Sequence, residues 1–186
     1  MSEPAPILIV KTAALGDVLR TNAIVPGLVE RHAPCRITWL TAPAAVDLVR
    51  THPDVAEIVT IDVRTPASVA AASERLARTR WERVISLDDE EVLCRVVSTL
   101  TTRALSGATL DASGQRTYTP DVAAWFDMGL LSHFGKAEAD RRKVANTRSQ
   151  PAIYAEMLGI RMGKPRLVLD APARAFAERF VARLAS

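Results

Sequence analysis

The amino-acid sequence predicts an α/β fold built on a parallel β-sheet with helices on both faces. Apolar segments of strand length alternate with segments of helical periodicity along the first half of the chain. The connections between them are short, which indicates βαβ units. The first apolar segment, ILIVK at residues 7–11, is continuous, as is typical of a strand buried on both faces.

The elements of this sheet follow in order along the chain. Apolar, β-branched and aromatic runs predict strands at residues 7–11, 36–41, 57–62, 83–87 and 103–108. Helical patterns between them predict helices at residues 17–32, 44–50, 68–80 and 90–101. Thr65-Pro66 is a favourable start for the third helix. Pro26 lies inside the first, and we expect it to kink or restart that helix because proline lacks a backbone donor.

The pattern changes in the second half of the chain. A polar loop followed by helical sequence occupies residues 111–150. A further helix is predicted at residues 151–158, with Gly159 as its C-cap. Residues 166–169 (RLVL) are predicted as a last strand, and residues 172–184 as a helix with apolar side chains spaced to pack against another surface.

Composition excludes several classes of function. The chain has 186 residues, of which 48% are hydrophobic and 24% charged, a balance typical of a soluble globular domain. The net charge of +3 is too small to predict nucleic-acid binding. No apolar run is long enough to span a membrane, and the N-terminus lacks the basic start of a signal peptide. We therefore expect a cytoplasmic protein without a nucleic-acid partner, and leave open peripheral attachment to the inner membrane face.

The residues that most often bind metals show no metal-site spacing. Cys35 and Cys94 are far apart and are interpreted as buried thiols in a reducing cytosol. His32, His52 and His133 lack the spacing of a zinc site or a catalytic triad, and we expect them at the surface or at helix ends. The sequence predicts neither a metal site nor a cofactor.

The first predicted strand runs into a loop with a single carboxylate, in the segment KTAALGDVLRT that ends at Thr21. The loop matches neither GxGxxG nor GxxxxGK[ST], so it does not support a nucleotide site. In sheets of this kind ligands bind beyond the carboxyl ends of the strands. Asp17 fits two roles at the helix start: an N-cap, which is the more common role, or a base that accepts a proton from a substrate hydroxyl.

The same loop resembles the opening of the ADP-heptose:lipopolysaccharide heptosyltransferases, glycosyltransferase family 9. The run from Val10 to Thr21 is similar to the family pattern [KR]-x-[ST]-[ST]-[LM]-G-D-[VI]-[LV]-x-T. The similarity continues at residues 37–40 (ITWL), 52–59 (HPDVAEIV) and 81–88 (WERVISLD). The Leu-Gly-Asp loop is its specific part, whereas the other segments are similar to many parallel-sheet proteins. The resemblance covers about the first half of the chain well and the rest loosely.

The resemblance implies the Rossmann-like N-terminal half of a GT-B fold, with residues 1–170 as an acceptor-binding domain. In this family the donor nucleotide sugar binds in a C-terminal domain and no metal is needed. Asp17 is implied as the general base that takes the proton from the acceptor hydroxyl. That hydroxyl attacks the anomeric carbon with inversion, and ADP leaves. The acceptor is a lipopolysaccharide or another glycan. The matched loop places substrate contacts at Lys11, Thr12, Ala14, Gly16, Arg20 and Thr21.

The sequence departs from the family pattern in two respects. Ala13-Ala14 stands where many members have a pair of hydroxyl residues, so acceptor specificity is expected to differ. The chain also ends where the donor domain should begin, and residues 171–186 are interpreted as the start of an interdomain linker helix. We therefore expect the chain alone not to transfer sugar efficiently, and expect an ADP-heptose-like donor to bind only together with a donor domain.

Other candidate site residues lie outside the first loop. Asp88 follows the fourth strand, where it could bind sugar hydroxyls or cap the next helix, and capping is favoured. Arg116, in the polar loop after the fifth strand, is a candidate partner for an acidic sugar or a phosphate. Trp125 and Phe126 are interpreted as core residues. The alternative function is a non-catalytic Rossmann-like binding module that needs a partner protein.

Overall fold

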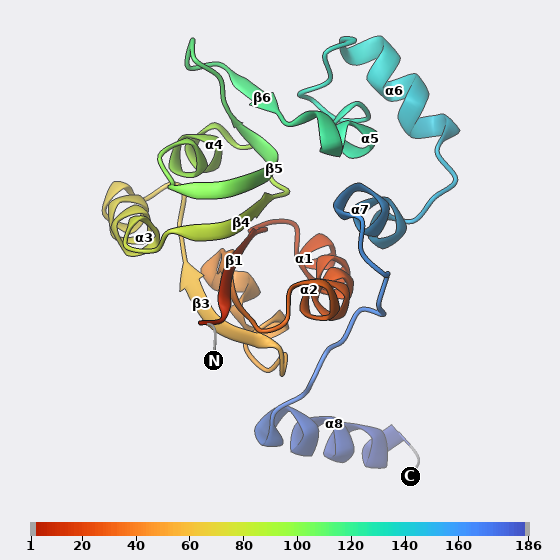
Figure 1. Ribbon diagram of the computed structural model, residues 1–186. Helices are drawn as coiled ribbons and strands as arrows, with labels where there is room; N and C mark the ends of the chain where they lie inside the picture. Colours follow the sequence, from red (N-terminus) through yellow and green to blue (C-terminus); the bar gives the residue numbers. More distant parts are fainter. Residues whose placement is uncertain (1–2, 185–186) are drawn as a thin grey trace.

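A six-stranded sheet with the strand order β3-β2-β1-β4-β5-β6 forms the centre of the protein (Figure 1). The computed structural model describes residues 3–184. The strands are β1 (Ala5–Val10), β2 (Cys35–Thr41), β3 (Val55–Thr60), β4 (Trp81–Ser86), β5 (Thr102–Leu110) and β6 (Arg116–Tyr118). β1 to β5 are parallel, which confirms each predicted strand of the sheet with slightly shifted bounds. β6 pairs antiparallel with β5 inside the stretch predicted as a loop.

Helices flank the sheet on both faces, as predicted. They are α1 (Leu15–Thr21), η1 (Asn22–Ile24), α2 (Val25–His32), η2 (Pro43–Leu48), α3 (Pro66–Ala77), α4 (Glu91–Ser98), η3 (Pro120–Val122), α5 (Ala123–Phe126), α6 (Lys136–Ala145), α7 (Gln150–Leu158) and α8 (Ala171–Leu184). The predicted restart at Pro26 is confirmed, because a 3-10 turn separates α1 from α2 and Pro26 lies in the first turn of α2. The helix predicted at residues 44–50 is instead the 3-10 segment η2.

The continuous apolar run of β1 is explained by two cores, one on each face of the sheet. Ile7 and Ile9 are fully buried in a cluster that also contains residues of α1, α2 and α7. Leu8 and Val10 point to the other face, where they are buried with residues of α3 and α4. Side chains alternate across a strand, so a strand covered on both faces has no polar positions.

The chain between β6 and α7 packs beside the sheet, where it forms a third apolar cluster. Cys94, Ala108, Tyr118, Val122 and Phe126 are its buried members. Phe126 is therefore a core residue, as predicted, whereas Trp125 is only half-buried. In Figure 1, α7 lies next to α1, with α5 and α6 farther out.

Gly107 allows β5 to approach β4 closely at Ser86, the last residue of β4. Its φ is +135°, and a Cβ atom there would lie 1.9 Å from the carbonyl oxygen of Ser86. We expect Gly107→Ala to lower the free energy of unfolding by about 2–4 kcal/mol, because it combines backbone strain with a steric overlap. Urea unfolding measures this loss.

Gly114 is the matched control for this substitution. It also has a positive φ, of +81°, but a Cβ atom there meets nothing within 4 Å. Gly114→Ala is therefore expected to cost only about 1 kcal/mol. Equal losses in the two variants would contradict the overlap with Ser86.

The segment after α7 returns along the domain in an extended conformation. Gly159 has φ +62° at the end of α7, which confirms the predicted C-cap. The prediction of a strand at residues 166–169 is wrong, because side chains bind this backbone instead of a neighbouring strand. The Asn22 amide accepts from the Arg166 N–H at 2.8 Å and donates to its carbonyl at 2.7 Å. The Thr51 hydroxyl donates to the Val168 carbonyl at 2.5 Å.

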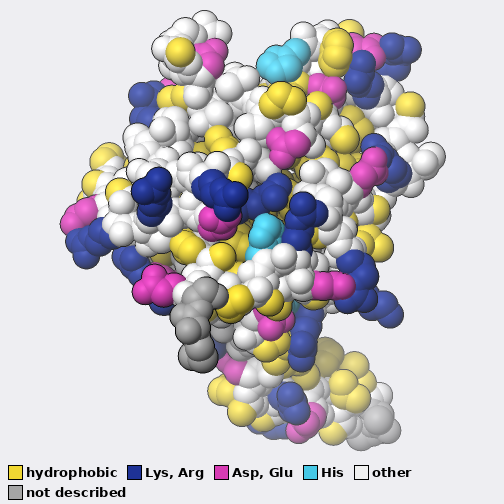
Figure 2. Space-filling model, in the orientation of Figure 1, with side chains coloured by type: hydrophobic (Ala, Val, Ile, Leu, Met, Phe, Trp, Pro, Cys, Tyr) yellow, Lys and Arg dark blue, Asp and Glu magenta, His cyan; other side chains and the backbone are white. Residues whose placement is uncertain are grey.

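Helix α8 projects away from the sheet at the end of this segment (Figure 1). Among its described residues no side chain is buried. Phe176, Phe180, Val181 and Leu184 are exposed, and Figure 2 shows hydrophobic side chains over this projecting part of the molecule. The predicted 172–184 helix is confirmed. Residues 1–2 and 185–186, which belong to the predicted 1–170 and 171–186 regions, lie outside the described residues.

Candidate functional site

The loop after β1 begins at a fixed position on the sheet. The carbonyl of Lys11 accepts two side-chain hydrogen bonds from β2, from Trp39 Nε1 at 3.1 Å and from Thr41 Oγ1 at 2.9 Å. On the other side of β1, the N–H of Leu87 donates to the Val10 carbonyl at 3.0 Å. The start of the loop is thus held by both neighbouring strands.

A buried ion pair ties this loop to the end of β4. The ammonium of Lys11 pairs with Oδ1 of Asp88, and Oδ2 of Asp88 accepts from the backbone N–H of Thr12 and from its hydroxyl, the latter at 2.7 Å. Lys11 is 6% exposed and Asp88 is 9% exposed. The capping role favoured for Asp88 is wrong, because the N-cap of α4 is Glu90 and no side chain caps that helix. Asp88 instead binds the ammonium of Lys11 and the N–H and hydroxyl of Thr12, the first two residues of the loop.

Asp17 lies in the first turn of α1, where a carboxylate is stabilised by the helix N-terminus. The N-cap position belongs to Ala14, so the capping interpretation of Asp17 is wrong. The Asp17 carboxylate pairs with the guanidinium of Arg20 one helical turn later. Its side chain is 29% exposed, which leaves the carboxylate accessible from solvent.

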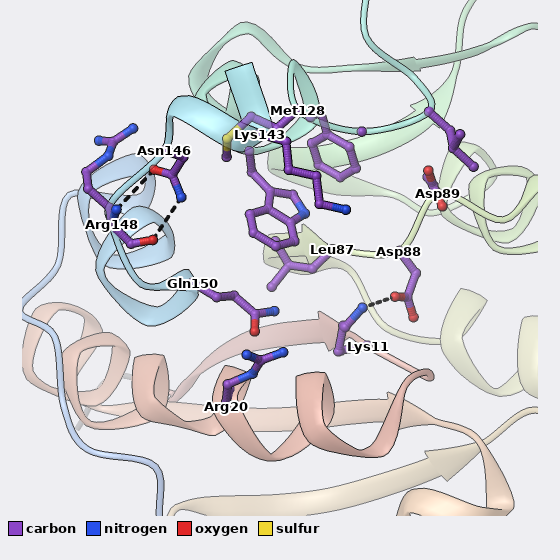
Figure 3. A pocket seen from close by; sticks show the side chains of 14 residues that line it. Lys11, Arg20, Leu87, Asp88, Asp89, Met128, Lys143, Asn146, Arg148 and Gln150 are labelled. Carbon is purple, nitrogen blue, oxygen red and sulfur yellow. Dashed lines mark hydrogen bonds and ion pairs between the residues drawn. The ribbon is translucent and has the colours of Figure 1, made fainter. Parts of the chain in front are cut away.

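A pocket of about 490 Å³ opens between the ends of β1 and β4 and the α5–α7 region (Figure 3). We call it the edge pocket. Lys11, Arg20 and Asp88 line it from the sheet side. Trp125 and Gln150 line it from α5 and α7, and it is completed by Leu87, Asp89, Phe126, Met128, Gly129, Leu130, Lys143, Asn146 and Arg148. Asp17 does not line the edge pocket, but it pairs with Arg20, which does.

The lining of the edge pocket suits a hydroxyl-rich ligand with negative charge. Carboxylates accept hydrogen bonds from hydroxyls, and Asp89 stands at its sheet side, whereas both carboxylate oxygens of Asp88 are already bound by Lys11 and Thr12. Arg20, Lys143 and Arg148 add cationic donors. The half-buried indole of Trp125 offers an apolar face with a polar edge.

The structure places the other residues predicted for the site in different surroundings. Ala14 and Gly16 are exposed at the start of α1. Thr21 is fully buried and can affect a ligand only through the position of α1. Arg116 donates to the carbonyl of Asp89 at 2.8 Å, so β6 braces the rim of the edge pocket. Thr12 faces a second pocket.

This second pocket, of about 420 Å³, lies on the other side of the β1 loop. Thr12 and Ala13 line it from the loop, together with Asp62, Arg64 and Glu90 among others. The alanines that replace the hydroxyl pair of the family pattern are Ala13 and Ala14, and Ala13 leaves this wall apolar. The β1 loop therefore separates two hollows at the carboxyl edge of the sheet.

Sequence reasoning missed the wall that α5 and α7 contribute. Gln150 donates from Nε2 to the Tyr154 hydroxyl at 3.0 Å, and Tyr154 meets Trp125 edge-on with ring centroids 4.9 Å apart. Burial raises the pKa of Tyr154 far above its ordinary value, which keeps this hydroxyl protonated; the Gln150 hydrogen bond opposes the rise, and the charges of Asp88 and Asp17 add to it. No local signal distinguishes these residues from ordinary core residues of a helix.

Metal-binding side chains do not gather in the described part of the chain. Between residues 3 and 184, no group of three or more His, Cys, Asp or Glu residues could hold a metal ion. Both cysteines are free thiols. Cys94 is buried, which raises the pKa of its thiol to about 11, while Cys35 is half-buried. Over the same residues, the helices fall short of the length and hydrophobicity needed to cross a membrane.

His52 is buried, contrary to the prediction of a surface or helix-end position. Its Nδ1 accepts from the N–H of Asp54 at 3.3 Å. Burial lowers the pKa of His52; Asp54 opposes the shift and Arg166 adds to it. The unfolded chain therefore takes up a proton near pH 6.5 more readily than the folded chain, so stability is expected to fall as pH decreases from about 7.5 to about 5.

Urea unfolding at several pH values measures this loss. His52→Asn keeps an acceptor near the position of Nδ1 but does not titrate, so its stability should depend less on pH over that range. A pH dependence identical to that of the parent chain would contradict the assignment to His52.

Comparison with known proteins identifies the fold. No protein-family model and no curated protein matches the chain. The structure of a glycosyl transferase family 9 protein from Veillonella parvula is similar with a TM-score of 0.72 and 16% identity, covering 100% of this chain and 52% of that chain. E. coli heptosyltransferase WaaC, solved with ADP-2-deoxy-2-fluoro heptose, gives a TM-score of 0.55 and 16% identity over 87% of this chain and 51% of that chain.

A third similar structure, E. coli ADP-heptose lps heptosyltransferase II, has a TM-score of 0.50 and 12% identity, covering 94% of this chain and 50% of that chain. At such identities the likeness shows the fold alone. It confirms the predicted fold class, a Rossmann-like half of a GT-B fold. The chain spans about half the length of each of these structures.

Proposed function

We propose that this chain, which has the fold of half a GT-B glycosyltransferase, is the acceptor-binding and base-bearing half of an inverting, heptosyltransferase-like enzyme of family 9. The observation that carries the proposal is the position of the β1 loop. It holds Asp17 in the first turn of α1, at the carboxyl edge of the sheet, and is fixed there by Asp88. Arg20 connects Asp17 to the edge pocket.

In this proposal the edge pocket binds a glycan acceptor, a lipopolysaccharide or a related saccharide. Asp17 takes the proton from the attacking hydroxyl, the hydroxyl oxygen bonds to the anomeric carbon, and the bond from that carbon to the phosphate oxygen of ADP breaks. The nucleotide sugar is held by a second half of the kind that the longer similar structures possess. E. coli WaaC was solved with ADP and with an ADP-heptose analogue. We place the reaction in the cytoplasm.

Titration of the chain with two ligands, followed by NMR of the backbone amides, tests this proposal. A lipopolysaccharide inner-core saccharide should shift the signals of Gly16, Asp17 and Val18, and ADP-heptose should not. Tight binding of ADP-heptose alone would place the donor site in this half and would remove the role proposed for Asp17.

The exposed face of α8 favours a second candidate, a non-catalytic binding module that needs a partner protein. Phe176 and Phe180 stack with centroids 6.3 Å apart and are 65% and 55% exposed. Val181 and Leu184 are exposed on the same helix, and contiguous exposed apolar patches are typical of interaction surfaces. Self-association that light scattering detects in the parent chain, and that is lost in Phe176→Ser, together with no saccharide binding, would favour this candidate.

A further inference from the structure

Gln150 carries a buried polar atom that the structure leaves without a partner. It is 7% exposed and begins α7, on the wall of the edge pocket. Its Nε2 donates to Tyr154, but its Oε1 is buried and has no hydrogen-bond partner among the described residues. Such an acceptor is costly to leave unpaired, so its surroundings indicate what completes it.

Arg20 is the donor that faces this atom. In Figure 3 the side chains of Gln150 and Arg20 point toward one another, and both line the edge pocket. Tyr154, which holds the Gln150 amide, lies within electrostatic range of Arg20 and Asp17. Guanidinium groups have five donors and no acceptor. If the two ends of the Gln150 amide were exchanged, donors would face donors, so the observed orientation is the one that Arg20 can complete.

The present partner of Arg20 holds it weakly. The pair with Asp17 spans one turn of α1, and the side chains of Arg20 and Asp17 are 56% and 29% exposed. Exposed ion pairs contribute little to stability, whereas a hydrogen bond to a buried acceptor removes a larger penalty. The loss of the pair with Asp17 would therefore cost little, while a hydrogen bond to Oε1 of Gln150 would remove a larger penalty.

We propose that Arg20 exchanges between Asp17 and Gln150, and that Gln150 is a positioning residue that frees Asp17 to accept the proton of the acceptor hydroxyl. In the first position the guanidinium occupies Oδ1 of Asp17. In the second position it is held by Oε1 of Gln150, and both carboxylate oxygens of Asp17 are open. The last step rests on the proposed function, whereas the exchange itself does not.

NMR of side-chain signals in the full chain tests the exchange without any ligand. Asp17→Asn removes the charge that holds Arg20, so the side-chain amide signals of Gln150 and the Nε signal of Arg20 should both shift. In the matched control the same substitution is made in an Arg20→Met background, where the stem of residue 20 remains but its donors are lost, and Asp17→Asn should then no longer shift the Gln150 signals. Backbone spectra confirm that each variant is folded.

Two results would overturn the exchange: Gln150 signals that do not move in Asp17→Asn, or the same shift in the Arg20→Met background. Arg20→Lys gives a second check, because the lysine ammonium reaches less far than the guanidinium and lacks its planar set of donors. In combination with Asp17→Asn it should shift the Gln150 signals less than the parent arginine does.

Binding of the inner-core saccharide tests the consequence for Asp17. Gln150→Leu should weaken binding by about 2–10-fold, the effect of one hydrogen bond, and should have no effect when Arg20 is already methionine. Equal binding by the parent chain and Gln150→Leu would overturn the positioning role. If the side-chain signals shift as expected but no variant binds the saccharide, the exchange stands and the proposed function is overturned.

Discussion

Asp88→Ala is expected to lower the free energy of unfolding by about 3–5 kcal/mol, because it leaves a buried lysine without its counter-charge. Lys11 is 6% exposed and pairs with Asp88 through its ammonium. The same substitution removes the acceptor of the Thr12 N–H and hydroxyl. Urea unfolding of the parent chain and the variant measures the loss, and disorder at Ala13 and Ala14 should accompany it.

The neighbouring acid provides the control for this prediction. Asp89 is half-buried, and among residues 3–184 its hydrogen bond from Arg116 is made to the backbone carbonyl, which Asp89→Ala retains. We therefore expect Asp89→Ala to change the free energy of unfolding by less than about 0.5 kcal/mol. Replacing both partners, Lys11→Met with Asp88→Leu, should recover much of the loss, since a buried pair can be exchanged for apolar groups at little cost. A loss below about 1 kcal/mol in Asp88→Ala would show that solvent reaches Lys11.

Asp17→Asn is expected to lower the rate of glycosyl transfer at least about 100-fold in a protein completed by a donor half, because general-base catalysis contributes that much or more. The fold should be unchanged, since Asp17 is partly exposed and its side chain pairs with the exposed Arg20 on the same helix. The effect should appear in kcat rather than KM, as the amide still fills the same space but cannot take the proton.

Asp47→Asn is the matched control for charge alone. Asp47 also forms an i,i+3 pair with an arginine, Arg50, and its side chain is 82% exposed. This variant should transfer sugar at the parent rate. Full activity in Asp17→Asn would remove the base assignment, and equal losses in both variants would indicate a general electrostatic effect.

The fold could be predicted from the sequence because its signals are local. The continuous apolar run of β1 and the alternation of strand and helix patterns report burial on two faces, and Pro26 marks the break between α1 and α2. The strand expected at residues 166–169 was wrong for a nonlocal reason. An apolar run does not show whether its backbone meets a strand or the side chains of Asn22 and Thr51.

The candidate site was only partly predictable for the same reason. Asp88 carries the local signature of a helix cap, but its partner Lys11 is 77 residues away in the sequence and comes close only because β1 and β4 are neighbours. Trp125 has the pattern of a core residue, and nothing in the sequence singles out Gln150. They line the edge pocket because α5 and α7 pack at the carboxyl end of the sheet, which periodicity does not show.

The two hydrogen bonds between the Asn22 amide and the Arg166 backbone fix the segment that leads to α8. The backbone of Arg166 and Val168 is hydrogen-bonded to Asn22 and Thr51, which anchors this part of the segment to the domain. We therefore expect any rotation of α8 to occur around Asp170, which forms an ion pair with Arg50. The Asn22 contacts are partly buried, whereas Arg50 is exposed and screened by salt. Higher ionic strength should therefore weaken the Arg50–Asp170 pair and make the orientation of α8 more variable. The hydrogen bonds that hold Arg166 and Val168 should remain.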